Sequence, residues 1–381
     1  MEKLDQVFVH LKAAIVHLAG SFLPDWLVVI ISILIPIVGI AMFGPVTMMY
    51  LTLIERKLLA RIQNRLGPNR VGKFGLLQPL ADGVKMLTKE DVVPTNADKI
   101  AHFLAPILIV IPALLVFAVI PFGRNMIAID LNIGVLFFLA ISATTTIFIF
   151  TAAWGSRNKF SLLGGMRSVA QMISYEIPFV LSAVPVFLIT GTFSTAHIVE
   201  AQPGLHWFVW TPWGFVGFLI FFLCGVAECN RTPFDLPEAE SEIIAGFHTE
   251  YSGMKFALFY MAEFMNVFTV SGLVVTLYLG GWQGPFLPSW IWFLIKTYVL
   301  ILIMMWFRGT FPRVRIDQLM NFAWKFLLPL SLVNILATGV WYYLRAPLNF
   351  LISGLIVVIG FSFLMFVNRH SLPKKRIYRY A

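Results

Sequence analysis

Long apolar segments are the feature that most restricts what this chain can fold into. Runs of roughly 20 residues with almost no charge recur along its 381 residues, separated by short polar connections. Only 12% of the residues are charged, whereas a soluble domain has about 25%. Backbone groups in lipid must be hydrogen-bonded within the spanning structure, so runs of this length indicate helices rather than barrel strands. The sequence therefore predicts an all-α integral membrane protein.

About nine transmembrane helices are expected, and residues 1–381 are interpreted as a single polytopic membrane domain. The expected spans are residues 27–54, 102–122, 133–154, 168–190, 207–227, 254–279, 287–307, 322–343 and 348–367. Pro36 and Pro45 lie inside the first span, which favours a kink or a tilt. The N-terminal MEKLDQ is mixed in charge and no small-residue cleavage site follows it, so no cleaved signal peptide is expected.

Basic side chains are concentrated in alternate connections. They gather in residues 55–101, 155–168, 308–321 and the tail after residue 368, whereas residues 191–206 and 280–286 contain none. This positive-inside pattern predicts that the N-terminus lies outside and the C-terminus inside. The net charge of +9 is thereby explained by topology, so we do not expect nucleic-acid binding.

The sequence contains no pattern typical of a redox cofactor site. Its two cysteines, Cys224 and Cys229, form no CxxC motif and no Cys/His cluster, so neither a metal site nor an iron–sulfur cluster is expected. A GxGxxG dinucleotide fingerprint is also missing. Any electron transfer in which the protein takes part must therefore occur on other chains.

An unusually acidic inner connection, residues 228–253, separates two of the expected spans. It contains Glu228, Asp235, Glu238, Glu240, Glu242 and Glu250. A helix start with Asp235 as N-cap would account for Asp235 and Glu238 without any function. It would not account for Glu240 and Glu242, and on a helix Glu238 and Glu242 repel each other. Crowded carboxylates at a low-dielectric boundary share protons, which suits a proton relay or a sensor of nearby charge.

Three further carboxylates lie in or at the apolar spans. Glu55 ends the first expected span, while Glu176 and Glu263 lie inside the fourth and the sixth. An ionisable group at a helix centre costs about 2.5–3.5 kcal/mol on the insertion scale. Each carboxylate is therefore either held by a neighbouring helix, exposed at the interface, or part of an ion path.

The inner connection 55–101 has its own pattern. After a Gly-Pro turn, Leu76, Leu77, Leu80, Val84 and Leu87 recur at helical spacing among polar residues. The run is too short and too polar to span, so we expect an amphipathic helix at the inner surface. It is either a lipid anchor or a wall of the access path of a hydrophobic ligand.

Five motifs carry a specific family resemblance. In chain order they are ERKLLARIQNRLGPNRVG, QPLADGVKMLTKED, SLLGGMRSVAQMISYEIP, RTPFDLPEAESEIIAGFHTEYSGMKFALFYMAEF and FPRVRIDQLMNFAWKFLLPL. Together they closely resemble the H-subunit family of the proton-pumping NADH:quinone oxidoreductase, complex I, the counterpart of mitochondrial NADH dehydrogenase subunit 1. The resemblance covers about residues 40–330, and none of these motifs departs from the family pattern.

The resemblance implies a membrane-arm subunit that forms the membrane-side wall of the quinone chamber and couples quinone reduction to proton translocation. The matching residues at the chamber and its access path are Glu55, Arg56, Arg65, Asp82, Lys85, Glu90 and Arg231. The matching residues of the carboxylate relay are Glu176, Glu228, Asp235, Glu238, Glu240, Glu242, Glu250 and Glu263.

The resemblance also implies the molecules with which the protein works. Quinone is expected as the bound substrate, while flavin and iron–sulfur clusters are expected in partner subunits. Partners would be the other membrane-arm subunits, the peripheral quinone-site and iron–sulfur subunits, and lipid. The length and the sequence favour a bacterial plasma membrane over a mitochondrial inner membrane.

Three alternatives remain open on the sequence alone. The chain could be the corresponding membrane component of an energy-converting hydrogenase or formate hydrogenlyase. It could be an autonomous transporter that uses the same acids as cation sites. It could also be an assembly anchor whose acids dock a soluble partner.

Overall fold

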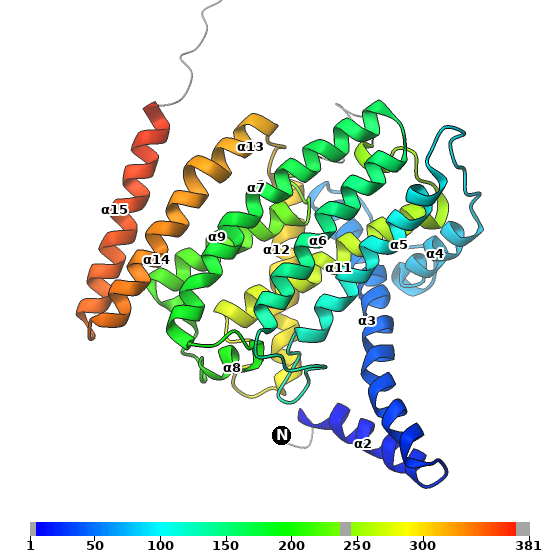
Figure 1. The fold of residues 1–381 in the computed structure, drawn as a ribbon, viewed down its shortest axis with the longest axis horizontal. Helices are drawn as coiled ribbons and strands as arrows, with labels where there is room; N and C mark the ends of the chain where they lie inside the picture. Colours follow the sequence, from blue (N-terminus) through cyan, green and yellow to red (C-terminus); the bar gives the residue numbers. More distant parts are fainter. Residues whose placement is uncertain (1–4, 237–244, 371–381) are drawn as a thin grey trace, which may run out of the picture.

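The computed structural model describes residues 5–236 and 245–370, and all regular secondary structure in these residues is helical. The long helices are α3 (Asp25–Ile62), α5 (Lys99–Leu115), α6 (Gly134–Gly155), α7 (Lys159–Thr190), α9 (Pro212–Glu228), α11 (Gly253–Tyr278), α12 (Ser289–Thr310), α14 (Leu328–Tyr343) and α15 (Leu348–His370). They stand side by side as a bundle (Figure 1). The shorter elements are α2 (Val7–Gly20), α4 (Gln78–Thr88), α8 (Thr195–Glu200), α13 (Ile316–Phe322) and the single turns η1 (Lys73–Gly75), η2 (Val116–Val119), η3 (Phe208–Trp210), η4 (Gly246–His248) and η5 (Ala323–Leu327).

Eight helices within the described residues are long and apolar enough to cross a membrane, which confirms an all-α membrane fold. The fifth of the nine expected spans differs, because α9 has only 17 residues. The reason lies at its start, where Thr211 caps the helix and Pro212 occupies the first helical turn, so that residues 207–211 are not part of it. A helix of this length is about 26 Å long. It packs among α7, α11 and α14 inside the bundle.

The first, the fourth and the eighth spans are longer than expected, and α7 begins at Lys159 rather than at residue 168. Helix α3 continues through Pro36 and Pro45 and ends at Ile62, so Glu55 lies well inside it rather than at its end. Helices α13 and α14 are joined by the π-helical turn η5 into one apolar run, Ile316–Tyr343. Hydropathy alone stops a span at its first charges, whereas the helical backbone continues beyond them.

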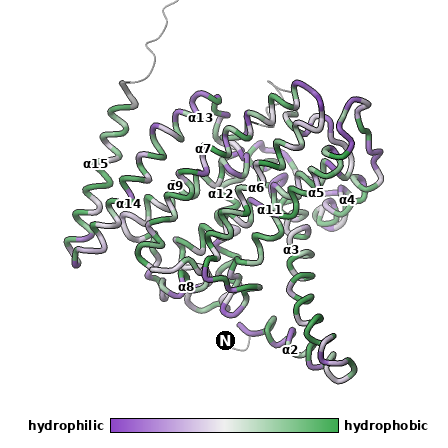
Figure 2. The backbone as a smooth tube through the Cα atoms, viewed as in Figure 1, coloured by the Kyte–Doolittle hydropathy of each residue, from purple (hydrophilic) through white to green (hydrophobic). Residues whose placement is uncertain are grey.

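Helix α11 forms the centre of the bundle. Every residue from Val267 to Tyr278 is buried, and the helix packs against α3, α5, α9 and α12. The absence of a side chain at Gly225 lets α9 approach it, because a Cβ there would lie 2.4 Å from Val270 Cγ1. Figure 2 shows this apolar interior, with hydrophilic residues mainly near the ends of the helices. The centre of the fold is therefore closely packed, and the polar groups described below interrupt it.

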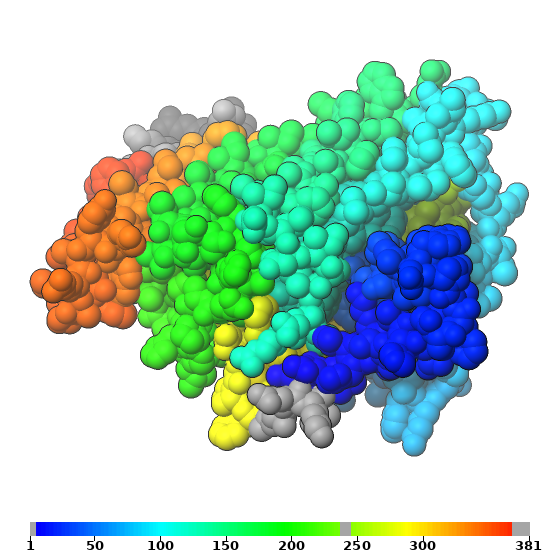
Figure 3. Space-filling view, turned by 60° about the horizontal axis from the view of Figure 1, so that its bottom comes forward, coloured from blue at the N-terminus to red at the C-terminus, as the bar shows by residue number. Residues whose placement is uncertain are grey.

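The N-terminal part stands at the edge of the molecule. Helix α2 was not expected; its 14 residues are apolar but too few to span, and none is buried. It packs beside the start of α3, and Figure 3 shows the two together at one side of the molecule. In Figure 1 the α6–α7 connection, α13 and the end of α15 lie at one end of the bundle, while α8 lies at the other.

Candidate functional site

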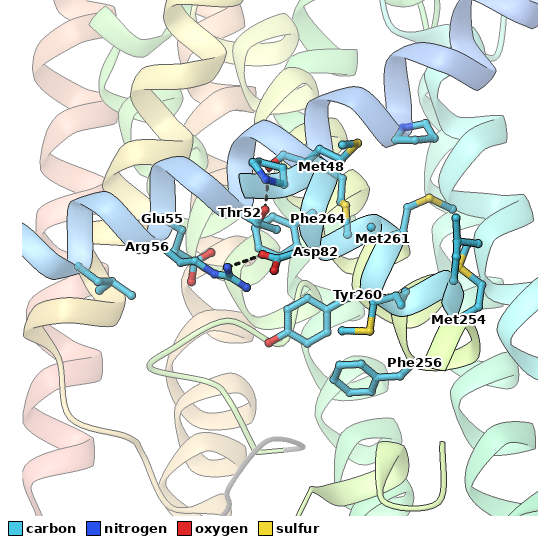
Figure 4. A pocket seen from close by; sticks show the side chains of 18 of the residues that line it. Met48, Thr52, Glu55, Arg56, Asp82, Met254, Phe256, Tyr260, Met261 and Phe264 are labelled. Carbon is cyan, nitrogen blue, oxygen red and sulfur yellow. Dashed lines mark hydrogen bonds and ion pairs between the residues drawn. The ribbon is translucent and has the colours of Figure 1, made fainter. Parts of the chain in front are cut away.

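A large apolar cavity opens between α3, α4 and α11. Its volume is about 500 Å³, within the range of sites for small organic ligands. Five methionines line it, together with aromatic residues of α11, and Figure 4 shows several of these side chains pointing into the space: Met48, Met49, Met86, Met254 and Met261. Methionine adapts its shape to an irregular apolar ligand. Few residues of the lining carry polar groups: Thr52, Glu55, Arg56, Asp82, Tyr260 and Arg308.

Helix α4 is the amphipathic helix expected from the sequence, and it forms one wall of this cavity. Pro79, Asp82, Gly83 and Met86 line the space. Leu80 and Val84 are exposed on the molecule's surface. The two expected roles of this segment are therefore compatible, because one side of α4 lines the cavity while other apolar residues remain free to face lipid.

An ion pair joins α3 and α4 across the cavity. Arg56 Nη1 lies 2.6 Å from Asp82 Oδ2, as Figure 4 shows, and Lys85 Nζ lies 3.8 Å from the same carboxylate. Four of the residues expected at the chamber and its access path do not line the cavity: Arg65, Lys85, Glu90 and Arg231. Arg65 instead donates to the side chain of Gln63 at 2.7 Å.

A buried ion cluster lies at the polar end of the cavity. Arg231 Nη1 donates to both oxygens of Glu55 at 2.9 and 2.8 Å, and its Nε lies 2.8 Å from Glu263 Oε1. Arg308 also pairs with Glu55. The Arg231 guanidinium lies over the ring of Phe264, 4.2 Å from its centroid. The cluster thus joins α3, the segment after α9, α11 and α12.

Burial explains why Glu55 needs these partners. Only 5% of its side chain and 8% of that of Arg231 are exposed. A buried carboxylate is tolerated when cations and hydrogen bonds compensate its lost hydration. Glu55 is therefore held by neighbouring elements and is not exposed at the interface. Arg308 was not predicted as a site residue, because beside Arg313 and Arg315 its charge indicates only topology.

A second, much smaller cavity lies beside Glu263. It has a volume of about 40 Å³, and its polar lining comes from Thr145, Glu228, Asn230, His248, Glu263 and Asn266. Glu228, at the end of α9, interacts electrostatically with Glu176 of α7. The structure therefore brings together Glu55, Arg231, Glu263, Glu228 and Glu176, which lie far apart in the sequence.

Two other predicted relay residues lie apart from this line. Asp235 is buried and its Oδ2 lies 3.0 Å from Arg313 Nη2. Glu250 Oε1 accepts a hydrogen bond of 2.5 Å from Asn158, the residue that caps α7. Glu238, Glu240 and Glu242 lie outside the described residues, as does the rest of the helix expected to start at Asp235.

Fold and site together define a class: a multi-pass helical membrane protein in which buried charges connect an apolar ligand cavity with the protein interior. Among the described residues, no group of three or more His, Cys, Asp or Glu side chains could hold a metal ion.

Comparison with known proteins identifies the family. Residues 35–339 match the family model described as NADH dehydrogenase. The chain is 48% identical over 340 residues to the H subunit of NADH-quinone oxidoreductase from Dehalococcoides mccartyi strain CBDB1, covering 89% of this chain and 95% of that one. It is 51% identical over 299 residues to the second H subunit of NADH-quinone oxidoreductase from Geobacter sulfurreducens, with 76% and 90% covered. The chain therefore belongs to the H-subunit family of NADH-quinone oxidoreductase, as its motifs predicted. It is a subunit of that enzyme complex, and its partners include other subunits of the complex.

Proposed function

We propose that the 500 Å³ cavity is the part of the quinone chamber that this chain contributes, and that the buried ion cluster starts a proton relay. A quinone combines a long apolar tail with a polar head. The methionine-lined walls suit the tail, while Thr52, Glu55 and Arg308 lie at the polar end. The names of the relatives, NADH-quinone oxidoreductase subunits, support this substrate class.

One observation carries the proposal. Arg231 bridges a carboxylate that lines the large cavity, Glu55, and a carboxylate that lines the small one, Glu263. Negative charge that develops on a quinone during its reduction would attract the guanidinium groups of Arg231 and Arg308. Glu55 and Glu263 would then be less well neutralised and would take up protons. Charge at the ligand is thereby converted into proton movement inside the membrane.

The relay continues from Glu263 through Glu228 to Glu176. Glu176 is only half-buried in this chain, so it is accessible to a neighbouring membrane subunit. Moving each proton against 100 mV costs about 2.3 kcal/mol, so the charge response must deliver several kcal/mol per proton. The family resemblance implies that a neighbouring soluble subunit binds the quinone head group, which agrees with the small number of polar groups in this cavity.

The test compares Glu263→Gln with Glu200→Gln in the assembled complex. Glu200 is an exposed carboxylate on α8 that lines neither cavity, and it serves as the matched control. We expect Glu263→Gln to lower NADH:quinone activity and proton pumping at least tenfold, an effect of about 1.4 kcal/mol, while the reaction of NADH with an artificial acceptor is retained. Wild-type pumping in Glu263→Gln would refute the relay.

A photoreactive quinone analogue tests the chamber separately. We expect it to label peptides that contain residues 45–59 of α3, 79–87 of α4 or 254–264 of α11. Labelling confined to other chains would contradict the assignment of the cavity.

We also propose that the protein lies in a bacterial plasma membrane with its N-terminus outside and its C-terminus inside. The bacterial relatives and the shared position of two basic connections, between α6 and α7 and before α13, at one end of the bundle support this orientation. Labelling of a single cysteine introduced at residue 205, between α8 and α9, should succeed from outside intact cells. Labelling from the inner face alone would reverse the orientation.

A further inference from the structure

His248 is a buried side chain to which the proposed function gives no role. It ends the turn η4 just before α11, and only 6% of the residue is exposed. Its imidazole ring packs against Phe247, Phe256 and Phe259, with centroids 3.8, 5.6 and 5.2 Å away. The position of η4 is itself fixed, because it packs against α7. The ring is therefore held firmly in place by apolar neighbours.

Two polar atoms of residues that line the small cavity have no hydrogen-bond partner among the described residues. They are Nδ1 of His248 and Oε2 of Glu228, and both are fully shielded from solvent. Both residues line the 40 Å³ cavity, together with Glu263. A buried polar atom without a partner is costly, and such atoms are normally satisfied by protein or by ordered water. The two atoms therefore indicate what occupies the cavity.

The size of the cavity agrees with water. One water molecule needs roughly 10–15 Å³ of such space, so 40 Å³ accommodates about three. The lining supplies the several polar partners that a buried water requires, since Asn230, Asn266 and Glu263 also border the space. A dry cavity would instead be lined by apolar groups alone.

We propose that the small cavity is a binding site for a cluster of about three waters, and that His248 is the positioning residue that fixes this cluster between Glu228 and Glu263. The inference rests on the proposed relay and deepens it, because it assigns the group that connects two of its carboxylates. A proton leaving Glu263 would pass to a water, and a proton of the same cluster would pass to Glu228. Charge and atoms balance, because the waters exchange protons without net change.

The protonation state of His248 suits this role. Burial lowers the pKa of its imidazole to about 3, so the ring is neutral near pH 7. A neutral imidazole has one nitrogen that donates and one that accepts a hydrogen bond. It can therefore orient water without carrying a charge that would hold the proton beside Glu228 and Glu263.

His102 provides a matched control. It too is a buried histidine whose Nδ1 has no partner among the described residues. Its ring stacks on Tyr251 at 4.2 Å, and its Nε2 lies 3.2 Å from the carbonyl oxygen of Glu250. It does not line the small cavity. Replacing it disturbs a buried aromatic contact of similar size without touching the proposed water site.

The experiment uses the assembled complex in proteoliposomes and compares His248→Leu, His248→Asn and His102→Leu. We expect His248→Leu to lower NADH-driven proton pumping about tenfold, as loss of one ordinary buried hydrogen bond would. Its reaction of NADH with an artificial acceptor should be unchanged. His248→Asn restores a polar atom and should recover most of the pumping, whereas His102→Leu should pump at the wild-type rate per assembled complex.

The outcomes separate this inference from the proposed function. Full pumping in His248→Leu, or equal loss in His248→Leu and His248→Asn, would overturn the positioning role while Glu263→Gln still tests the relay. If Glu263→Gln also pumps normally, the relay itself fails. A cryo-EM map of the complex that resolves ordered water should show density within hydrogen-bond distance of His248 Nδ1, and an empty cavity would overturn the water site.

Discussion

Replacing Glu55 by glutamine tests whether the buried ion cluster holds the fold together. The substitution keeps the size of the side chain but removes the negative charge between Arg231 and Arg308. Arg231 keeps its contact with Glu263, and the new amide still offers one acceptor oxygen. The loss should therefore lie at the lower end of the 3–5 kcal/mol typical of breaking a buried pair, at about 3 kcal/mol.

Asp82→Asn serves as the control, because it removes a carboxylate from an ion pair that is partly exposed, Arg56–Asp82. The side chains of Arg56 and Asp82 are 53% and 26% exposed, so solvent screens their attraction. Exposed pairs contribute about 0.2–1 kcal/mol, which is at most about fivefold in an equilibrium constant. The two substitutions thus remove the same kind of charge from neighbouring elements, and they differ mainly in burial.

Thiol labelling of Cys229 in the purified complex measures how much each substitution destabilises the segment around the ion cluster. Cys229 lies two residues before Arg231 and is 2% exposed, so a thiol reagent reaches it only when the segment opens. Peptide mass spectrometry gives its labelling rate, which follows the open population when reclosing is fast. A loss of about 3 kcal/mol should accelerate labelling at least about 100-fold in Glu55→Gln. Equal rates in Glu55→Gln and Asp82→Asn would refute the view that burial makes this cluster structurally important.

Three more predictions concern the cavity, the buried histidine and the acidic connection. Gly83 lines the large cavity, and a Cβ added there would meet no atom within 4 Å, so Gly83→Phe places a ring in the cavity and should raise the KM for quinone several-fold. Gly39→Phe is the control: a Cβ at Gly39 also meets no atom within 4 Å, and this substitution should leave the KM for quinone unchanged. Because burial lowers the pKa of His248 to about 3, its contribution to stability is present above pH 6.5 and is lost as the pH falls from 6.5 towards 3. At pH 5 the loss of folding free energy is about 2 kcal/mol. The fall in Tm between pH 7 and pH 5 should therefore be smaller in His248→Gln than in the wild type. An equal fall in both proteins would contradict a neutral buried ring. Glu240→Gln combined with Glu242→Gln should reduce pumping while assembly and NADH oxidation by an artificial acceptor persist. Release of the peripheral quinone-site and iron–sulfur subunits would instead favour a docking role.

Most of the membrane fold could be predicted because span length and hydropathy are local properties. Helices α5, α6, α11 and α12 lie close to their expected positions, since uninterrupted apolar runs leave a chain in lipid no other way to satisfy its backbone. The predicted ends of spans are wrong where hydropathy and helix formation disagree. Helix α3 continues past its first charges because partners elsewhere in the fold neutralise them.

The partners of the charged residues could not be predicted in the same way. Arg231 is 176 positions from Glu55, and Arg308 is 253 positions from it. A single sequence gives the position of each charge along the chain, but only packing of the helices decides which charges meet. The acidic connection illustrates the limit, since its composition pointed to Glu250, which contacts Asn158, as strongly as to Glu228, which lines the small cavity.

His248 and Arg308 could not be predicted as site residues from the sequence, for a common reason. One is a lone histidine in an acidic run, and the other a basic residue among several that mark topology. Their proposed roles rest on position, because His248 borders the small cavity and Arg308 the large one. Arg231 lies between them and contacts a carboxylate of each cavity. In the proposed relay, a change of charge in the large cavity would therefore alter the balance of ions at the small one, which is the physical requirement for coupling a ligand to proton movement.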